Sequence, residues 1–371
     1  MLFGHFGDRI GRKATLVGAL LTMGIATFII GVLPTYQTAG IIAPALLALM
    51  RFCQGLGLGG EWSGAALLAS ETAEEGKRAS AAMWPQFGAP FGFLLANGFF
   101  LTLVATMDYS RGDTTGTFME WGWRLPFLAS AVMVLIGLYV RLRLEETPVF
   151  QQAVDEGKKV KTPMVEAFRT AWKPMIIGTF VMVSCYTLFY LVTTWILSYG
   201  IGDKSQGLGL GIPYLEFLEI QLISIFMFII GIPVSSMLSD RYGRKPILVV
   251  TSLIMITFGF SFPFFLGIEH ADRNSVLGFL LVGMFIMGLI FGPMSAVLPE
   301  LFPTNVRYTG SGIAYNVSSI LGAAVAPFIA TWLVSAFNVS YVGYYLIIVC
   351  FISLIAILMM QELKDQDLSQ V

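Results

Sequence analysis

Apolar stretches alternate with short polar loops along almost the whole chain. Each stretch has roughly the 20 residues that an α-helix needs to cross a bilayer, whereas membrane-spanning strands are shorter and alternate apolar with polar positions. The pattern therefore predicts an all-α polytopic membrane protein with ten spans. The predicted spans are 15–34, 40–69, 80–104, 124–142, 174–199, 215–238, 247–268, 277–298, 309–336 and 343–361, and residues 1–6 are expected to be the remnant of a further helix.

The loops between these spans are alternately rich and poor in basic residues. The basic group, with its flanking residues, holds most of the 22 Lys and Arg residues and comprises 7–14, 70–79, 143–173, 239–246, 299–308 and 362–371. Since cytoplasmic loops carry the excess of Lys and Arg, we expect these loops and the C-terminus to lie in the cytoplasm, in a multi-pass protein of the cell (inner) membrane.

The longest basic segment suggests how the chain is divided. Residues 1–142 are predicted to form an incomplete N-terminal bundle, 143–173 a cytoplasmic central loop, 174–361 a six-helix C-terminal bundle and 362–371 a cytoplasmic tail. An internal repeat supports two related halves, because the motif DRxGRK occurs at 8–13 and again at 240–245. Other landmarks recur at nearly the same offset of about 230 residues, as expected of a duplicated unit.

The repeat also predicts that the first half is incomplete. Four spans follow the motif in each half, but two full spans precede it only in the second half. We therefore expect the chain to be truncated at its N-terminus by two helices relative to its own repeat.

Composition excludes several classes of function. Hydrophobic residues make up 56% of the chain and charged residues 12%, about half the charge usual in soluble domains, and the net charge of −1 gives no bias toward nucleic acid. Cys53, Cys185 and Cys350 fall inside predicted spans, and His5 and His270 lie in different loops, so neither disulfides nor a metal site is expected. No nucleophile–base set or phosphate loop is visible, and we expect neither an enzyme nor a bound cofactor.

Several motifs resemble one known family. The stretch GHFGDRIGRK (4–13) resembles the loop 2–3 signature of the major facilitator superfamily, and 236–245 resembles its loop 8–9 counterpart. The metabolite:proton symporter branch of that superfamily is similar at RFCQGLGLGGEW (51–62), WPQFGAPFGFLLANG (84–98), WGWRLPFL (121–128), ETPVF (146–150) and LPELFPTNVRYTGSGIAYN (298–316). The resemblance implies a fold of two six-helix bundles, twelve helices in all, that moves small organic solutes together with protons.

Charged residues of the repeated loops are candidates for a cytoplasmic gate. Arginine can form forked pairs with carboxylates across a bundle interface, and such pairs could hold one side of a transporter shut. The alternative is that these residues only fix topology. The candidates are Asp8, Arg9, Arg12, Lys13, Glu71, Arg78, Asp240, Arg241, Arg244, Lys245, Glu300 and Arg307.

Polar groups inside the predicted spans are candidates for a substrate or proton cavity. A charge near the bilayer midplane, such as Arg51, normally faces a cavity or a partner, and buried amides and phenols also need partners. Structural ion pairs and interhelical hydrogen bonds are the alternatives. The candidates are Arg51, Gln54, Gln86, Asn97, Tyr186, Tyr190, Tyr315 and Asn316.

Two further features invite a functional interpretation. Glu61, near the cytoplasmic end of the second span, is a weaker candidate for handling protons, and the preferred interpretation is a snorkelling residue or one that pairs with a loop. The glycines of GLGLGG (55–60) fit the dinucleotide fingerprint GxGxxG, but no strand precedes them. Glycines spaced along a membrane helix let neighbouring backbones approach closely, so we interpret them as packing residues.

These observations predict a secondary active transporter. The preferred function is proton-coupled symport, by alternating access, of a small organic acid or similar polar metabolite into the cell. Protons are the expected coupling ion, a midplane arginine favours an anionic solute, and the protein is expected to be a monomer in the lipid bilayer without nucleic acid. An exporter or antiporter, and an inactive truncated product, are the alternatives.

Overall fold

The computed structural model describes residues 11–74, 76–107, 115–143, 163–362 and 364, and this part of the chain is helical, without strands. The first half contains α2 (Arg12–Val32), α3 (Tyr36–Ala39), α4 (Ile42–Glu71), α5 (Arg78–Gln86), α6 (Gly88–Thr106), α7 (Thr117–Glu120), η1 (Gly122–Arg124) and α8 (Leu125–Leu142). The second half contains α10 (Pro163–Thr170), α11 (Trp172–Tyr190), η2 (Leu191–Trp195), α12 (Ile196–Gly200), α13 (Tyr214–Tyr242), α14 (Arg244–Gly259), α15 (Phe262–Leu266), α16 (Arg273–Phe291), α17 (Met294–Glu300), η3 (Thr304–Val306), α18 (Arg307–Ser319), η4 (Ile320–Ala324), α19 (Ala326–Ala336) and α20 (Val339–Met359).

Nine helical segments of the described residues are long and apolar enough to cross a membrane, and they correspond to nine of the ten predicted spans. The remaining predicted span, 247–268, consists of α14 and α15 with a turn at Phe260 and Ser261 between them. Pro263 explains the break, because a proline has no backbone N–H with which to continue the helical hydrogen bonding from Gly259.

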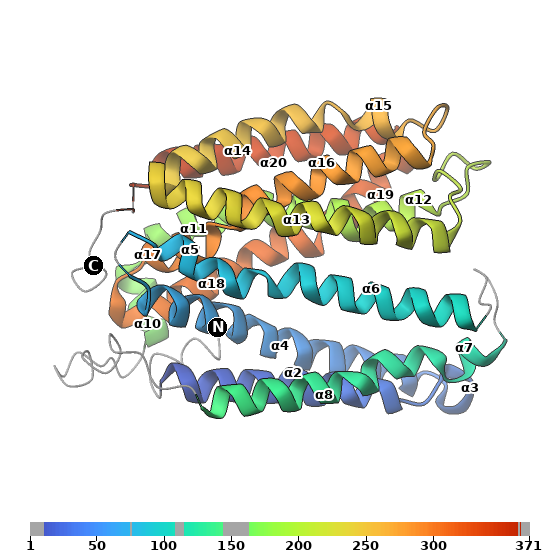
Figure 1. Cartoon of the computed structure of the whole chain (residues 1–371), viewed down its shortest axis with the longest axis horizontal. Coiled ribbons are helices and arrows are strands. Elements are labelled where there is room, and N and C mark those ends of the chain that lie inside the picture. Colours follow the sequence, from blue (N-terminus) through green and yellow to red (C-terminus); the bar gives the residue numbers. More distant parts are fainter. Residues whose placement is uncertain (1–10, 75, 108–114, 144–162, 363, 365–371) are drawn as a thin grey trace.

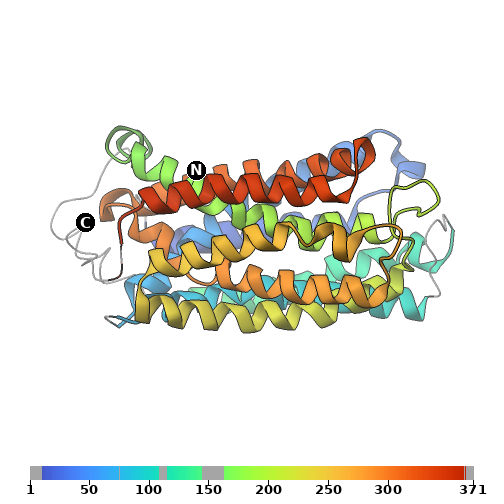
Figure 2. The same ribbon diagram turned by 90° about the horizontal axis from the view of Figure 1, so that it is seen from above.

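The long helices run side by side along the longest axis of the molecule (Figures 1 and 2). In Figure 1, α2, α4, α6 and α8 lie in the lower part and α13, α14, α15, α16, α19 and α20 in the upper part, with α17 and α18 between them at the left. Helix α2 packs against α4 and α8, whereas α13 packs against α16, and α14 against α20. The two groups meet where α5 and α6 contact α13 and where α4 contacts α17 and α18. The proposed division of the chain at 143–173 stays a prediction.

Prolines interrupt the helices at the centre of this arrangement. Pro85 lies one residue before the end of α5, Pro293 lies between α16 and α17, and Pro327 lies in the first turn of α19. Pro90 follows the first of these breaks, in the first turn of α6. Three of these four prolines therefore coincide with helix breaks, and Pro90 lies next to one of them.

Glycines allow α4 to lie close to its neighbours. A β-carbon at Gly57 would lie 2.7 Å from the carbonyl oxygen of Ala19 in α2, and one at Gly59 would lie 2.5 Å from Oδ1 of Asn316 in α18. Both glycines belong to the GLGLGG stretch, and their helix-packing interpretation is confirmed.

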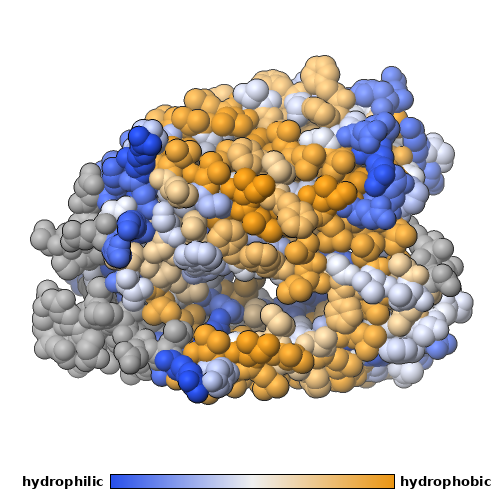
Figure 3. Space-filling view, in the orientation of Figure 1, coloured by the Kyte–Doolittle hydropathy of each residue, from blue (hydrophilic) through white to orange (hydrophobic). Residues whose placement is uncertain are grey.

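The surface is consistent with a bilayer-spanning protein. Figure 3 shows a broad apolar band across the middle of this face, with hydrophilic side chains concentrated toward the two ends. The face is also hollowed in its lower part, below α6. Among the described residues, many large apolar side chains on the long helices are exposed, as expected of helices that face lipid rather than water.

Candidate functional site

A pocket of about 390 Å³ lies where α4 and the start of α6 meet α11, α16 and α18. Its size is in the usual range of small-molecule sites, and it joins residues from both parts of the chain. The lining residues are Gly55, Leu58, Gly59, Ala89, Met182, Cys185, Tyr186, Phe189, Tyr190, Met287, Phe291, Tyr315, Asn316, Ser319 and Ile320. None of these lining residues carries a charge.

Aromatic rings form much of the pocket wall. Tyr186 meets Tyr315 edge to face, with ring centroids 5.3 Å apart, and Phe189 meets Tyr190 in the same way at 5.5 Å. Behind Tyr315 lies Trp62 of α4, stacked on it at 4.0 Å with an interplanar angle of 12°. Such rings offer apolar faces to a solute, while the tyrosine hydroxyls can form hydrogen bonds.

Two wide helical turns begin directly beside the pocket. The π-helical turn η2 follows Tyr190, and η4 follows Ser319. Gln221 of α13, which is buried, donates a hydrogen bond of 2.7 Å to the carbonyl oxygen of Thr193 within η2. Since π-turns interrupt the regular helix and are frequent at functional sites, they mark this pocket as the place where α11 and α18 deviate from regular geometry.

Four of the eight predicted cavity residues line this pocket: Tyr186, Tyr190, Tyr315 and Asn316. The Asn316 amide donates to the carbonyl oxygens of Gly59, at 3.1 Å, and Gly312, at 2.6 Å. This side chain therefore joins α18 to α4 at the edge of the pocket.

Gln86 lies next to the pocket but does not line it. Its amide accepts a hydrogen bond from Nε1 of Trp62 at 2.8 Å and donates to the carbonyl oxygen of Phe291 at 2.7 Å. Phe291 is the last residue of α16, just before the break at Pro293. Gln86 thus links the ring behind the pocket to a helix end in the other half of the chain.

The other three predicted cavity residues lie elsewhere. Arg51 is exposed, and its guanidinium donates to Oε1 of Gln54 at 3.2 Å. Gln54 in turn donates to Oγ1 of Thr27 in α2 at 2.6 Å. Asn97 is half-buried in α6 and its Nδ2 has no hydrogen-bond partner in the described structure. Their proposed roles stay predictions.

Sequence reasoning missed Trp62, Phe291 and the glycine edge of the pocket. Trp62 ends the motif RFCQGLGLGGEW, and its place in this motif could have marked it as a candidate. Its contact with Tyr315 could not be predicted, because the two residues lie far apart in the sequence. Gly55 and Gly59 carry no polar side chain that could have marked them, and Gly59 lines the site where α4 packs closely against Asn316 of α18.

Six of the twelve gate candidates meet at the end of the molecule that carries α5, α10 and α17, which we name the gate end (Figure 1). At its centre Glu300 of α17 accepts hydrogen bonds from Arg244 of α14, at 3.0 and 3.2 Å, and both side chains are only 1% exposed. Arg78 of α5 approaches the same carboxylate at 3.9 Å. This cluster therefore brings together charges from both halves of the chain.

Asp240 extends the cluster to a helix N-terminus. It pairs with Arg244 at 3.1 Å, and its two carboxylate oxygens accept the backbone N–H groups of Ala79, at 3.0 Å, and Ser80, at 2.8 Å, in the first turn of α5. A carboxylate at this position satisfies free N–H groups and complements the helix dipole.

A second buried pair joins the halves nearby. Glu71, the last residue of α4, lies 3.6 Å from Arg307, the first residue of α18, and both side chains are fully buried. Tyr308 adds a hydrogen bond of 2.6 Å from its hydroxyl to the carbonyl oxygen of Gly60. Contacts between α4 and α18 thus extend from the pocket to the gate end.

The remaining gate candidates take other positions. Lys245 caps the end of α20 through the carbonyl oxygens of Leu358 and Met360, and the guanidinium of Arg241 lies over the ring of Tyr242. Arg12 and Lys13 are the first residues of α2. Asp8 and Arg9 lie outside the described residues.

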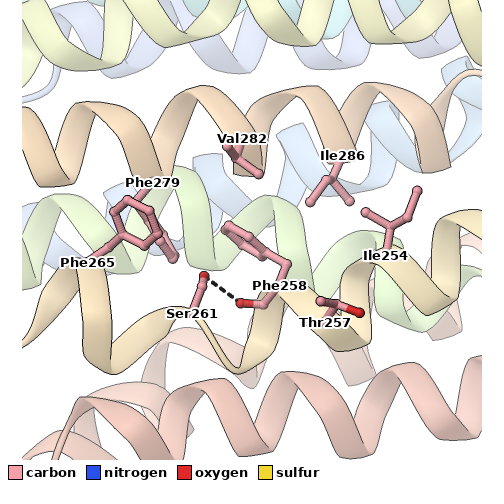
Figure 4. A pocket seen from close by; sticks show the side chains of 8 residues that line it. All are labelled: Ile254, Thr257, Phe258, Ser261, Phe265, Phe279, Val282 and Ile286. Carbon is pink, nitrogen blue, oxygen red and sulfur yellow. Dashed lines mark hydrogen bonds between the residues drawn. The ribbon is translucent and has the colours of Figure 1, made fainter.

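A further pocket of about 310 Å³ lies between α14, α15 and α16 (Figure 4). Its wall is apolar except for Thr257 and Ser261, and the Ser261 hydroxyl donates to the carbonyl oxygen of Phe258 at 2.7 Å. This pocket involves the second half of the chain alone.

The family model of the Major Facilitator Superfamily matches residues 1–327. The chain belongs to this superfamily. It is similar to the inner membrane metabolite transport protein YhjE of Escherichia coli, with 49% identity over 99% of this chain and 81% of the relative. The shikimate transporter of Escherichia coli is 35% identical over 98% of this chain and 81% of its own length, and the proline/betaine transporter of Salmonella typhimurium is 33% identical over 99% and 73%.

Solved structures agree on the fold. The proton:xylose symporter XylE superposes with a TM-score of 0.75 over 99% of this chain and 84% of XylE, at 18% sequence identity. The expected fold class is confirmed, and the protein is a multi-pass secondary transporter rather than an enzyme. In this superfamily member the pocket between α4, α11 and α18 is the natural candidate for the solute site.

Proposed function

We propose that the protein imports a small, carboxylate-bearing organic solute together with protons, by alternating access. The pocket between the two parts of the chain carries this proposal, because it is held closed toward the gate end by contacts between α4 and α18 and by two sets of buried ion pairs. A transporter that exposes its site to one side at a time needs such contacts, which must separate when the other side opens.

The chemistry of the pocket favours a small solute with both apolar and polar parts. Ring faces can pack against an apolar body or an ammonium group, while the tyrosine hydroxyls can donate to a carboxylate. Proline, betaine and shikimate, the solutes named for two of the relatives, all bear a carboxylate. Because the pocket wall is uncharged, we propose that neutral donors bind the carboxylate of the solute. This replaces the expectation that Arg51 binds it.

The gate end is proposed to face the cytoplasm. The basic loops and the C-terminus belong to that side by the positive-inside rule, and the relative named as an inner membrane protein supports the same membrane. We further propose a monomer as the transporting unit, since each half of the pocket comes from the same chain.

Uptake into proteoliposomes tests this function. The purified chain would be offered labelled proline, glycine betaine, shikimate and simple carboxylates, with the outside more acidic than the inside. We expect accumulation of at least one solute, abolished by a protonophore and weakened in Asn316→Ala. Accumulation only with the opposite gradient would replace import by antiport or export, and transport of none of the panel in either direction would refute the proposed solute class.

A further inference from the structure

One ion pair inside the spans belongs neither to the pocket nor to the gate end. Glu61 lies ten residues before Glu71, the last residue of α4, which is about 15 Å along the helix. It is therefore well inside the span Ile42–Glu71. Its carboxylate pairs with the guanidinium of Arg141 of α8, with exposed side-chain fractions of 21% and 16%. Arg141 belongs to the last turn of α8, so the pair lies within α4 but near the end of α8. Ionisable groups inside a membrane span are costly and usually functional.

The two oxygens of this carboxylate have different surroundings. Oε1 accepts the hydrogen bond from Arg141, whereas Oε2 is buried and has no hydrogen-bond partner in the described structure. A buried anionic oxygen without a donor is unfavourable, and a proton on that oxygen removes the charge that causes the cost. The geometry thus leaves one oxygen satisfied and the other open to a proton.

The pair also connects three helices. Arg141 donates a second hydrogen bond, of 2.8 Å, to the carbonyl oxygen of Leu16 in α2. It therefore ties α4 to α2 and α8 while Glu61 is ionised. Once Glu61 is neutral, the tie between α4 and α8 loses its charge-assisted hydrogen bond.

The segment of α4 that carries Glu61 is the one that contacts α18. Gly59 and Gly60 accept hydrogen bonds from Asn316 and Tyr308, Trp62 stacks on Tyr315, and Glu71 pairs with Arg307. A change in how firmly this segment is held against α2 and α8 therefore acts directly on the contacts that close the pocket toward the gate end.

The other charged and titratable groups around α4 have their own partners. From α18, Tyr308 is bonded to Gly60, and Tyr315 lies close enough to Glu61 for an electrostatic interaction. Arg78 of α5 and Glu300 of α17 belong to the cluster at the gate end. Helix α2 has no charged residue after Lys13. Among the residues that the structure describes, Arg141 is thus the cation that pairs with Glu61.

We propose that Glu61 is the proton-coupling carboxylate and that its protonation, by breaking the pair with Arg141, loosens the closed contact between α4 and α18. The step forms one O–H bond, with the proton taken from one side of the membrane and released to the other. The inference rests on the proposed transport function and assigns its ion site, behind Trp62 rather than among the lining residues.

Hydrogen–deuterium exchange on the full chain in lipid nanodiscs tests this inference without any solute. Protection factors, corrected for the intrinsic effect of pH, would be followed in segments 57–72 and 307–320 from neutral to acidic pH. We expect protection in the wild type to fall by about tenfold on acidification, the effect of losing one charge-assisted hydrogen bond. In Glu61→Gln protection should be low at every pH.

Three variants separate this role from a structural one. Glu61→Asp keeps a carboxylate and should keep the response to pH. Arg141→Gln removes the same tie from the other side, and its protection should be low at every pH, as in Glu61→Gln. Glu74→Gln, which removes an exposed carboxylate paired with Lys77, should behave as the wild type.

The outcomes test the role of Glu61 separately from the proposed transport function. A Glu61→Gln protein that keeps the wild-type response to pH would overturn the inference, and so would a wild type without a response. In proteoliposomes, Glu61→Gln should lose proton-driven accumulation but keep solute exchange at equal pH. The wild type could also transport nothing while the hydrogen–deuterium exchange results agree with the inference. In that case the proposed function fails, and the role of Glu61 as a proton-controlled tie remains.

Discussion

At the scale of single residues, the site depends on side chains that pair across large distances in the sequence. Tyr186 and Tyr315 were predictable as polar aromatics inside spans, and both line the pocket. Their mutual contact and the stacking of Trp62 on Tyr315 were not, because nothing in the local pattern specifies which faces of α4, α11 and α18 meet. Arg51 shows the converse case. Its depth in a predicted span was informative, but a helix has several faces, and this arginine lies on an exposed one.

Tyr315→Ala should weaken solute binding. The substitution removes a pocket wall and leaves Trp62 without its stacking partner, a loss of about 0.5–1.5 kcal/mol per aromatic pair. We expect KM for uptake to rise by up to about tenfold, with a smaller change in maximal rate. Tyr315→Phe keeps the ring and removes only the hydroxyl, so it separates the effect of the ring from that of the hydroxyl. An unchanged KM in the alanine variant would show that the pocket does not bind solute in the rate-determining state.

Arg244→Met should destabilise the protein strongly. The variant leaves the carboxylate of Glu300 buried without its principal partner, and breaking such a buried pair costs about 3–5 kcal/mol. The measurement is the free energy of unfolding in mixed micelles. Arg273→Met is the matched control, because Arg273 is 48% exposed and its pairs with Glu216 and Glu219 should contribute about 0–1 kcal/mol. Equal losses in the two variants would contradict the proposed importance of burial.

At the scale of helices, hydrophobic length predicted nine spans that the structure confirms. It could not predict that α14 stops at Gly259, because hydropathy does not register the missing N–H of Pro263. The π-turns η2 and η4 were also beyond the sequence pattern, since they depend on tertiary contacts such as the one between Gln221 and Thr193. In contrast, the glycines of α4 predicted close packing correctly, because a missing side chain directly allows backbones to approach.

The start of α16 should stabilise the protein in a manner that depends on pH. Asp272 accepts the backbone N–H of Ser275 at 2.8 Å, and this hydrogen bond, with that of the Ser275 side chain, lowers the pKa of Asp272. The stabilisation is therefore present above the ordinary pKa of aspartate and is lost as the pH falls through the lowered pKa of the folded state.

Comparison with Asp272→Asn isolates this effect. Asparagine also caps helices but does not titrate. We expect the wild type to have the higher Tm at neutral pH and to lose that advantage in acid, while the Tm of the variant changes less over the same range. Parallel pH profiles for the two proteins would show that the cap does not contribute to stability.

At the scale of the whole molecule, buried polar contacts between the two parts of the chain gather toward the gate end. The clusters around Glu300 and Arg307, the hydrogen bond from Ser295 to the carbonyl oxygen of Ala82, and the α4–α18 contacts all lie between the pocket and that end. The internal repeat indicated which loops would be related, and Glu300 and Arg307 were predicted from it as gate candidates. Their pairing partners, Arg244 and Glu71, could be fixed only by the relative placement of the halves.

Alternating access requires these contacts to separate in each cycle, and a reversible cross-link tests that requirement. Ala82 of α5 and Ala296 of α17 belong to one buried cluster that joins the two parts of the chain. In a background with Cys53, Cys185 and Cys350 replaced by alanine, the pair Ala82→Cys and Ala296→Cys should block uptake when joined by a short thiol cross-linker. Cleavage of the linker should restore uptake.

The control for this experiment lies within the first part of the chain. Leu20 of α2 and Gly137 of α8 are in close contact, since a β-carbon at Gly137 would lie 3.3 Å from the Leu20 side chain. Joining Leu20→Cys to Gly137→Cys should leave uptake largely intact, because rocking of two bundles does not need these helices to part. If both cross-links block uptake equally, helices must move within a bundle, and rigid rocking about the pocket would be the wrong description of the cycle.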